Sequence, residues 1–354
     1  MNVPDEAAFL LLVGYGVVAL GGSGPYFILA LHGEQGTAKS TVARILRALV
    51  DPHKVPQRRP PKDERDLVIA AKNNYVIAFD NVSHLPQWFS DSLSSIATGA
   101  GFGTRKLYTD TDETLINVRR PIILNGLPDL VEHRQDLAER AIVLFLPRIV
   151  DTHRRSEQEL WRAFDEAHPK IFGAFLDVLS GALRNLPKTH LKGLPRMADA
   201  VTWVTAAESA LGWPAGSFIN AYEAHLTRRR REAAELDAVV VAIRDLLLRR
   251  KSRSWSGTVG ELLATLNRSF DAPTWENRHS KAWPSTPGSL GKHLRRAAPL
   301  LEALGIESGD GYRGQGNDTR KIVRFRLPLE AETKATARTA RKSRPSSVRS
   351  KKKW

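Results

Sequence analysis

The sequence contains no cysteine among its 354 residues, so disulfide bonds and cysteine-ligated zinc sites are excluded. The absence suits a reducing compartment. A membrane-spanning run is also lacking, because the apolar stretch at residues 7–20 is too short to cross a bilayer. Asp5 and Glu6 precede it, where a secretory signal would carry positive charge. We therefore predict a cytoplasmic protein without a membrane partner, in which residues 7–20 form a buried helix beside the first strand.

Acidic residues are scarce in only one part of the chain. The whole chain has 53 Lys and Arg against 38 Asp and Glu, and residues 228–354 hold 29 of these cations but only 13 of the acids. The first 227 residues are thus nearly neutral, with 24 cations and 25 acids. A neutral domain joined to a strongly basic one is typical of a protein that binds nucleic acid. The alternative is a solvated basic surface without a partner.

A phosphate-binding pattern lies near the amino terminus, between an apolar run at residues 25–31 and a helical pattern at residues 41–50. It fits G-x-x-x-x-[GA]-K-[ST], the P-loop pattern, with alanine where a second glycine is usual. Its residues are Gly33, Glu34, Gln35, Gly36, Thr37, Ala38, Lys39, Ser40 and Thr41. Such a loop wraps backbone N–H groups around a phosphate, and the following helix adds partial positive charge. We predict that Lys39 reaches the β- and γ-phosphates of ATP, that Ser40 ligates Mg²⁺, and that Ala38 costs the loop little.

A second buried strand is predicted at residues 75–79, and it ends in Asp80 and Asn81. An acid at this point, about forty residues after a P-loop, is typical of the aspartate that holds Mg²⁺ opposite the loop serine. Many ATPases have glutamate at the next position, where Asn81 stands. Asparagine can position a water molecule but cannot take its proton. The catalytic base is therefore unassigned, and slow hydrolysis is one reading.

A glycine-rich approach to a β-hairpin follows a helix predicted at residues 85–97. Arg105 and Lys106 stand there beside aromatic residues, a combination that suits contact with a nucleic-acid strand. A solvated basic hairpin is an equal alternative on this local pattern. A further buried strand then ends in Asn125, which we expect between the two earlier strands and near the γ-phosphate. Arg140 precedes one more strand, where an arginine can complete a neighbouring subunit's nucleotide site. On its own pattern, the alternative is a surface salt-bridge partner.

This order of motifs resembles superfamily 3 helicases, especially the helicase half of phage and mobile-element primase–helicases. The run ATGAGFGTRKLYTD looks like their pore hairpin, and RRPIILNGLPDL looks like their sensor-1 strand. The resemblance covers roughly residues 6–147. It implies that Lys39, Ser40 and Asp80 bind the nucleotide and Mg²⁺ and that Asn125 is the sensor-1 residue. It further implies that Arg140 is the arginine finger and that the hairpin residues Arg105 and Lys106 contact DNA. It also implies a homo-oligomeric ring. No primase domain is visible in the sequence, so we expect at most the ATPase end of such a machine, with a separate primase as one candidate partner.

The remainder of the chain divides by pattern. Residues 151–235 show helical periodicity, which predicts a lid or linker with Trp161, Trp203 and Trp213 in its core. Three helical patterns and an alternating strand at residues 236–328 predict a winged helix-turn-helix. Its expected DNA contacts are Lys292, Arg295 and Arg296 on one helix, with Arg313, Arg320 and Lys321 on the wing. A winged helix used for protein contact is the alternative, and residues 329–354 are predicted to be a disordered basic tail.

The sequence thus predicts an α/β protein with a P-loop NTPase core at residues 1–150, a helical lid and a winged helix. The function we predict is that of a DNA helicase- or translocase-like ATPase of phage or mobile-element replication. It would couple ATP hydrolysis to DNA remodelling, with ATP and Mg²⁺ as cofactors. One alternative is a DNA-binding ATPase switch without unwinding activity, which Asn81 favours. Another is a non-enzymatic DNA-binding protein with a degenerate P-loop, against which the intact Lys39–Ser40 pair argues.

Overall fold

The computed structural model describes residues 2–22, 24–99, 101–105, 113–126, 134–191, 193–268, 283–313 and 320–328. Backbone alone is described at 101–105, 113–116, 135, 313 and 320. The chain forms two compact units, Met1–Arg229 and Arg230–Trp354. Helix α8 (Ser217–Leu236) runs through the boundary between them.

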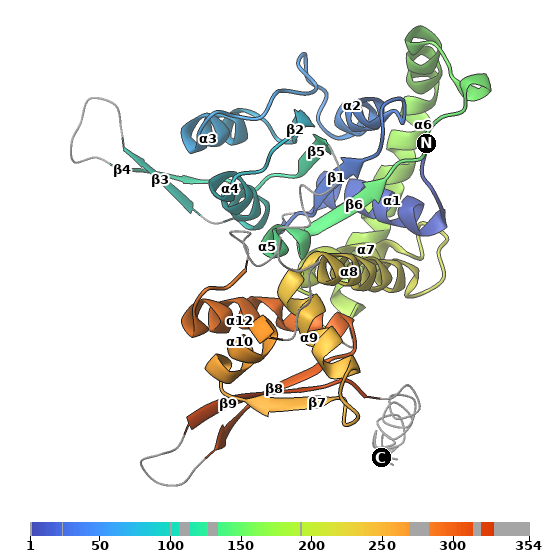
Figure 1. Cartoon of the computed structure of the whole chain (residues 1–354). Coiled ribbons are helices and arrows are strands. Elements are labelled where there is room, and N and C mark those ends of the chain that lie inside the picture. Colours follow the sequence, from blue (N-terminus) through green and yellow to red (C-terminus); the bar gives the residue numbers. More distant parts are fainter. Residues whose placement is uncertain are drawn as a thin grey trace, which may run out of the picture. The chain divides into compact units, whose positions relative to one another are not determined.

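A four-stranded parallel sheet forms the centre of the first unit (Figure 1). Its strand order is β2-β5-β1-β6, from β2 (Ile77–Val82), β5 (Ile122–Gly126), β1 (Ile28–His32) and β6 (Ala141–Phe145). A bridge from Arg58 to Phe79 extends the pairing beyond β2. The predicted α/β class with a parallel sheet is confirmed, and the Asn125 strand lies between the other two as expected.

Both faces of the sheet are buried, because successive residues of each strand enter opposite cores. One core contains Leu29 and Leu31, and it packs against helices on the first face: α1 (Glu6–Gly21), α2 (Lys39–Val50), α7 (Ala198–Ala207) and α8. The other contains Ile28 and Ala30, and it packs against the helices of the second face: α3 (Glu64–Asn73), α4 (Gln87–Thr98) and α5 (Gln135–Ala138). The prediction of a buried helix at residues 7–20 is confirmed, and the Tyr15 hydroxyl donates to the Ile122 carbonyl at 3.2 Å.

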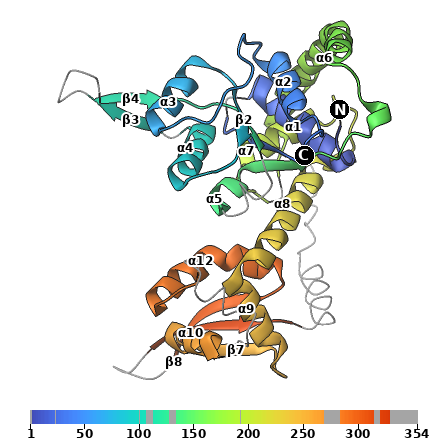
Figure 2. The same cartoon turned by 45° about the horizontal axis from the view of Figure 1, so that its top comes forward.

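The antiparallel hairpin predicted after α4 is present, from β3 (Gly101–Arg105) to β4 (Glu113–Asn117). Figures 1 and 2 show it projecting away from the parallel sheet. Arg105 pairs with Glu113 in the backbone ladder, and its side chain and Lys106 lie outside the described residues.

The helical region differs from its prediction in detail. The two helical patterns of the sequence at residues 157–174 and 176–186 form a single helix, α6 (Glu157–Asn185). A capping box at Ser156 starts this helix, and Pro169 does not break it. Short 3₁₀ turns flank α6 at Asp151–His153 and Leu186–Lys188. Trp203 and Trp213 pack against the sheet core as predicted. Trp161 does not, since its ring lies under the Arg44 guanidinium, 5.0 Å from the ring centre.

The second unit has its own apolar core and a three-stranded antiparallel sheet of order β7-β9-β8. Its described elements follow in the order α9 (Ala238–Leu248), β7 (Ser254–Gly257), α10 (Val259–Arg268), α12 (Pro287–Ala303), β8 (Glu307–Arg313) and β9 (Arg320–Arg326). The three predicted helices are present, whereas β7 was missed because its four residues, SWSG, show no apolar alternation. The predicted disordered tail at residues 329–354 lies outside the described residues.

The domain limits predicted at residues 150, 235 and 328 stay predictions. Helices from the predicted lid, α7 and the first part of α8, contribute Val201 and Phe218 to the same core as β1. Among the described residues, no helix is both long and apolar enough to cross a membrane.

Candidate functional site

The loop that joins β1 to α2 has the conformation of an anion cradle. Gly33 and Gly36 have positive φ values of 141° and 80°, and Ala38, which caps α2, has a φ of 63° and a ψ of 28°. Successive turns of this kind point backbone N–H groups toward a common centre. The expectation that Ala38 costs little is wrong, because a Cβ in the left-handed region carries a steric cost of roughly 1 kcal/mol or more.

The side chain of Lys39 folds back over this loop. Its ammonium donates to the Gly33 carbonyl at 2.8 Å and to the Glu34 carbonyl at 2.7 Å. Burial lowers the pKa of Lys39, and the negative charge of Asp80 partly opposes that shift. A cation held by neutral carbonyls at the mouth of an anion cradle is placed to exchange them for phosphate oxygens.

Three polar side chains meet at the carboxyl edge of the parallel sheet, where β2 and β5 end and α2 begins. Ser40 donates from Oγ to Asp80 Oδ1 at 3.2 Å, and Asn125 donates from Nδ2 to Ser40 Oγ at 2.8 Å and also to Asp80 Oδ1. Asn125 is buried, at 2% exposure, while the other two are half-buried. Three separate chain segments therefore place their polar groups within one hydrogen-bonded cluster.

A β-bulge sets the direction of Asp80 and Asn81. The pairing of β2 with β5 skips a residue between Phe79 and Val82, and Asn81 has a φ of 54°, which asparagine tolerates better than most residues. The backbone N–H of Asn81 donates to Asp80 Oδ1 at 3.0 Å, which fixes the carboxylate. The Asn81 side chain itself is exposed.

Arg140 lies at the opposite edge of the sheet from this cluster, immediately before β6. Its Nη1 contacts Asp136 Oδ2 at 2.7 Å, and the side chain is only 14% exposed. Burial by itself would raise the pKa of Asp136, but the hydrogen bond and charge of Arg140, joined by Arg196, hold that pKa below its usual range. The structure therefore does not bring Arg140 to the Asp80 cluster of its own chain.

Arg154 is a residue near the loop that sequence reasoning missed. It follows the 3₁₀ turn Asp151–His153, and its Nη2 lies 3.2 Å from where a Cβ on Gly36 would stand. The signal that could have found it was only an Arg-Arg pair before a helix cap, which by itself says nothing about a loop more than a hundred residues earlier.

The predicted DNA-contacting residues of the second unit occupy an exposed face. Lys292, Arg295 and Arg296 stand on one side of α12 and are all exposed. Lys321 pairs with Asp310 at 2.7 Å; that hydrogen bond raises the pKa of Lys321, and the nearby charge of Arg295 opposes the shift. Arg313 and Arg320 pair with each other in the backbone of β8 and β9, and their side chains lie outside the described residues.

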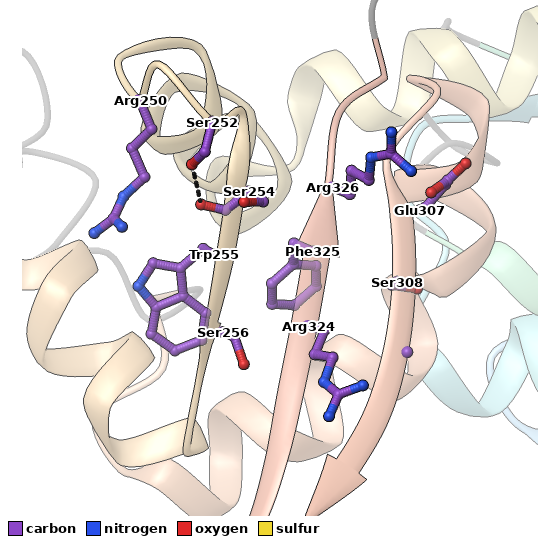
Figure 3. A pocket seen from close by; sticks show the side chains of 11 residues that line it. Arg250, Ser252, Ser254, Trp255, Ser256, Glu307, Ser308, Arg324, Phe325 and Arg326 are labelled. Atoms are coloured by element: carbon purple, nitrogen blue, oxygen red, sulfur yellow. Dashed lines mark hydrogen bonds between the residues drawn. The ribbon is translucent and has the colours of Figure 1, made fainter. Parts of the chain in front are cut away.

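A hollow opens on the small sheet of the second unit (Figure 3). Its lining includes Arg250, Trp255, Arg324 and Arg326, none of which the sequence singled out. It contains no residue of the loop or of the Asp80 cluster, so it is a separate feature. Among the described residues, no group of three or more His, Cys, Asp or Glu side chains is placed to hold a metal ion on its own.

Comparison with protein families decides what kind of protein carries this arrangement. The model for the actinomycete integrative conjugative element replication protein matches residues 2–229. The chain belongs to this family. A second model, for the C-terminal domain of the same replication proteins, matches residues 239–343.

Other comparisons add little to this family assignment. No curated protein matches the chain. Two solved structures of the NrS-1 C-terminal region, an A-form apo structure and one of residues 305–718, are 12% and 11% identical to it. Both have a TM-score of 0.35 and align over 92% of this chain and 76% of theirs, scores too low to support an inference about fold or function.

The family assignment confirms one prediction at a coarse level: the chain is a replication protein of a mobile element. A replication protein of an integrative conjugative element acts on DNA, which agrees with the basic excess of residues 228–354.

Proposed function

We propose that this replication protein is an ATP hydrolase of superfamily 3 helicase type, which couples ATP turnover to translocation on DNA or to its remodelling. One observation supports the proposal above the others. Ser40, Asp80 and Asn125 come from three segments and meet beside the loop that carries Lys39. A P-loop serine, an acid at the end of a strand and a polar residue on the strand between is the arrangement that nucleotide hydrolysis by such proteins requires.

The residues fit ATP with Mg²⁺. Mg²⁺ prefers hard oxygen ligands and usually takes only one or two from protein, the rest being water and phosphate oxygens. The Ser40 hydroxyl and the Asp80 carboxylate, 3.2 Å apart, supply such oxygens. Mg²⁺ would neutralise charge on the terminal phosphates, the loop from Gly33 to Thr41 and Lys39 would hold those phosphates, and Asn125 would orient the attacking water.

DNA binding is assigned to two elements. The order helix, strand, helix, helix, strand, strand of the second unit is that of a winged helix-turn-helix, in which α12 would be the recognition helix. Its exposed cations Lys292, Arg295 and Arg296 support contact with phosphates. The β3–β4 hairpin is the second element, and in a homo-oligomeric ring its Arg105 and Lys106 would contact DNA in the pore.

ATP turnover by the full chain, with and without single-stranded DNA, tests the proposal. We expect Mg²⁺-dependent hydrolysis that DNA stimulates, lost in Asp80→Ala, and ATP binding that is lost in Lys39→Ala. The matched control is Asp63→Ala, which removes an exposed helix cap on α3, distant in sequence from the site, and should leave turnover unchanged. Wild-type ATP affinity in Lys39→Ala would reject the nucleotide site.

The second candidate is a DNA-binding ATPase switch that does not unwind. The observation that favours it is Asn81, which stands where an acid would act as base and whose side chain is exposed on a bulge. ATP binding that changes DNA affinity, with turnover that DNA does not raise, would select the switch over the motor. Loss of ATP binding altogether would leave a non-enzymatic DNA-binding protein.

A further inference from the structure

The strongest unassigned feature beside the loop is the arginine that approaches it from outside. Arg154 Nη2 lies within 3.2 Å of the position that a Gly36 side chain would take. Glycine at this point leaves room for the guanidinium, and its φ of 80° also disfavours other residues. Two cations thus flank one loop, since Lys39 binds the carbonyls of Gly33 and Glu34.

The ion pair that Arg154 forms in this structure is a weak one. The Arg154 Nε contacts Asp151 Oδ1 at 3.2 Å, and the two side chains are 50% and 79% exposed. Exposed ion pairs of this kind add little stability, so the guanidinium loses little by leaving the pair. A polyphosphate offers several charged oxygens and the bidentate geometry that guanidinium groups prefer.

The segment that carries Arg154 is fixed to the loop and to α2. The Ile149 amide donates to the Gly36 carbonyl at 3.4 Å, and Asn2 bridges the carbonyls of Thr37 and Pro147. On the other side of Arg154, Glu157 at the start of α6 pairs with Arg44 of α2 at 2.6 Å. The arginine is therefore held near the loop from both directions along the chain.

We propose that Arg154 binds the phosphates of the nucleotide held by the same chain, and that it exchanges Asp151 for them when the nucleotide enters. The ligand class is a nucleoside polyphosphate. The inference rests on the proposed function, because it requires a nucleotide in the loop. It assigns to Arg154 a binding role in its own subunit, distinct from the role in a neighbouring subunit predicted for Arg140.

Nucleotide titrations of the full-length protein test this role, with binding of ATP, ADP and adenosine followed by calorimetry. Arg154→Ala should weaken ATP binding by about tenfold, as expected for a charge-assisted hydrogen bond that is partly exposed to water. ADP should be weakened as well, and adenosine should be unaffected. Arg155→Ala, which removes the adjacent exposed arginine, is the matched control and should bind like wild type.

Asp151→Asn gives a second, opposite readout. It removes the carboxylate that competes with phosphate for Arg154, so ATP should bind about two- to threefold more tightly, the scale of a lost exposed ion pair. The melting temperatures of Arg154→Ala and Asp151→Asn should stay near that of wild type, because both side chains are exposed.

The outcomes separate this inference from the proposed function. If Lys39→Ala loses ATP binding but Arg154→Ala binds as tightly as wild type, the role of Arg154 is wrong and the nucleotide site stands. A larger effect of Arg154→Ala on adenosine than on ATP would place the arginine on the base and also overturn the inference. Wild-type binding in Lys39→Ala would reject the nucleotide site itself.

Discussion

The two edges of the parallel sheet carry polar groups of different kinds. At the carboxyl edge, Asp80 and Asn125 both bond to Ser40, and Lys39 donates to the carbonyls of Gly33 and Glu34 and to the Thr37 hydroxyl. At the amino edge, Arg140 is paired with Asp136, which also holds Arg196. Under the proposed function, a nucleotide and Mg²⁺ would replace the carboxyl-edge contacts with equivalent oxygens. At the amino edge, Arg140 pairs with Asp136 of its own chain through Nη1, while its buried Nε has no hydrogen-bond partner among the described residues.

This difference bears on how Arg140 can act. Because it lies across the sheet from the Asp80 cluster, any catalytic role must be in the site of another subunit. Its pairing with Asp136 would then hold the guanidinium in place for that neighbour. The alternative is that the pair is structural and only stabilises the turn before β6.

The largest expected effect separates these two roles. We expect Arg140→Ala to bind ATP normally but to lose turnover by about 1000-fold, the scale of an arginine finger. Mixing it with Asp80→Ala protein should restore some turnover, because an intact Arg140 then faces an intact Asp80 at mixed interfaces. Turnover per site in the mixture is the measurement.

Arg196→Ala is the control, because it removes the other partner of Asp136 while keeping Arg140. Its turnover should stay close to that of wild type. If Arg140→Ala lowers the melting temperature but keeps wild-type turnover, or if wild type is active as a monomer, the pair at the amino edge is structural.

The second expected effect compares the hairpin with α12. Arg105→Ala combined with Lys106→Ala should remove DNA stimulation of ATP turnover, yet lower the salt dependence of DNA binding by only about 1–2 units of slope. The triple change of Lys292, Arg295 and Arg296 to alanine should lower that slope by about 2–3 units while basal turnover is kept. Normal stimulation in the hairpin variant would remove the pore-hairpin assignment and leave α12 as the DNA element.

Local patterns predicted most of the sheet and the cluster. Strands that end in Asp80 and Asn125 are apolar runs followed by a polar residue, and parallel pairing brings such ends to one edge. Ser40 is fixed by its place at the start of α2. These features depend on short segments and on a rule of sheet geometry, so the sequence alone predicts them.

The features that were missed depend on contacts between distant segments. Arg154 reaches Gly36 only because the chain after β6 turns back over the loop. The cost of Ala38 depends on its backbone angles, which its identity does not give. Strand β7 has little apolar pattern and is held by pairing with β9.

Arg229 is another residue whose environment the sequence did not reveal. It belongs to a run of four arginines at residues 228–231, a pattern typical of a solvated helix end or of a phosphate contact. The structure places its guanidinium over the ring of Phe145, 5.5 Å from the ring centre, and buries the side chain. At Arg229 the solvated interpretation is wrong, because α8 covers β6 at this point.

The smallest expected effect concerns β6, the outer strand of the parallel sheet, which runs from the amino edge to the carboxyl edge compared above. His225 of α8 accepts a hydrogen bond at Nε2 from the Val143 amide at 3.2 Å. Burial, together with the charges of Arg229 and Arg228, lowers the pKa of His225 to about 4 from an ordinary value of 6.5. Its neutral form is therefore part of the fold, and protonation favours the unfolded chain.

The free energy of unfolding should consequently be highest above pH 6.5 and fall as the pH drops toward 4, because the unfolded state binds the extra proton first. The full loss attributable to His225 is of the order of 3 kcal/mol. In His225→Gln the side-chain amide oxygen can still accept from the Val143 amide, so this contact should be kept. The variant should be less stable than wild type at pH 7, but it should lose less stability between pH 7 and pH 5 because glutamine does not take up a proton. Urea unfolding of both proteins at the two pH values measures this difference. Equal pH dependence would mean that His225 does not hold the edge of β6 in its neutral form, and that the sheet edge is closed by the apolar contacts of α8 alone.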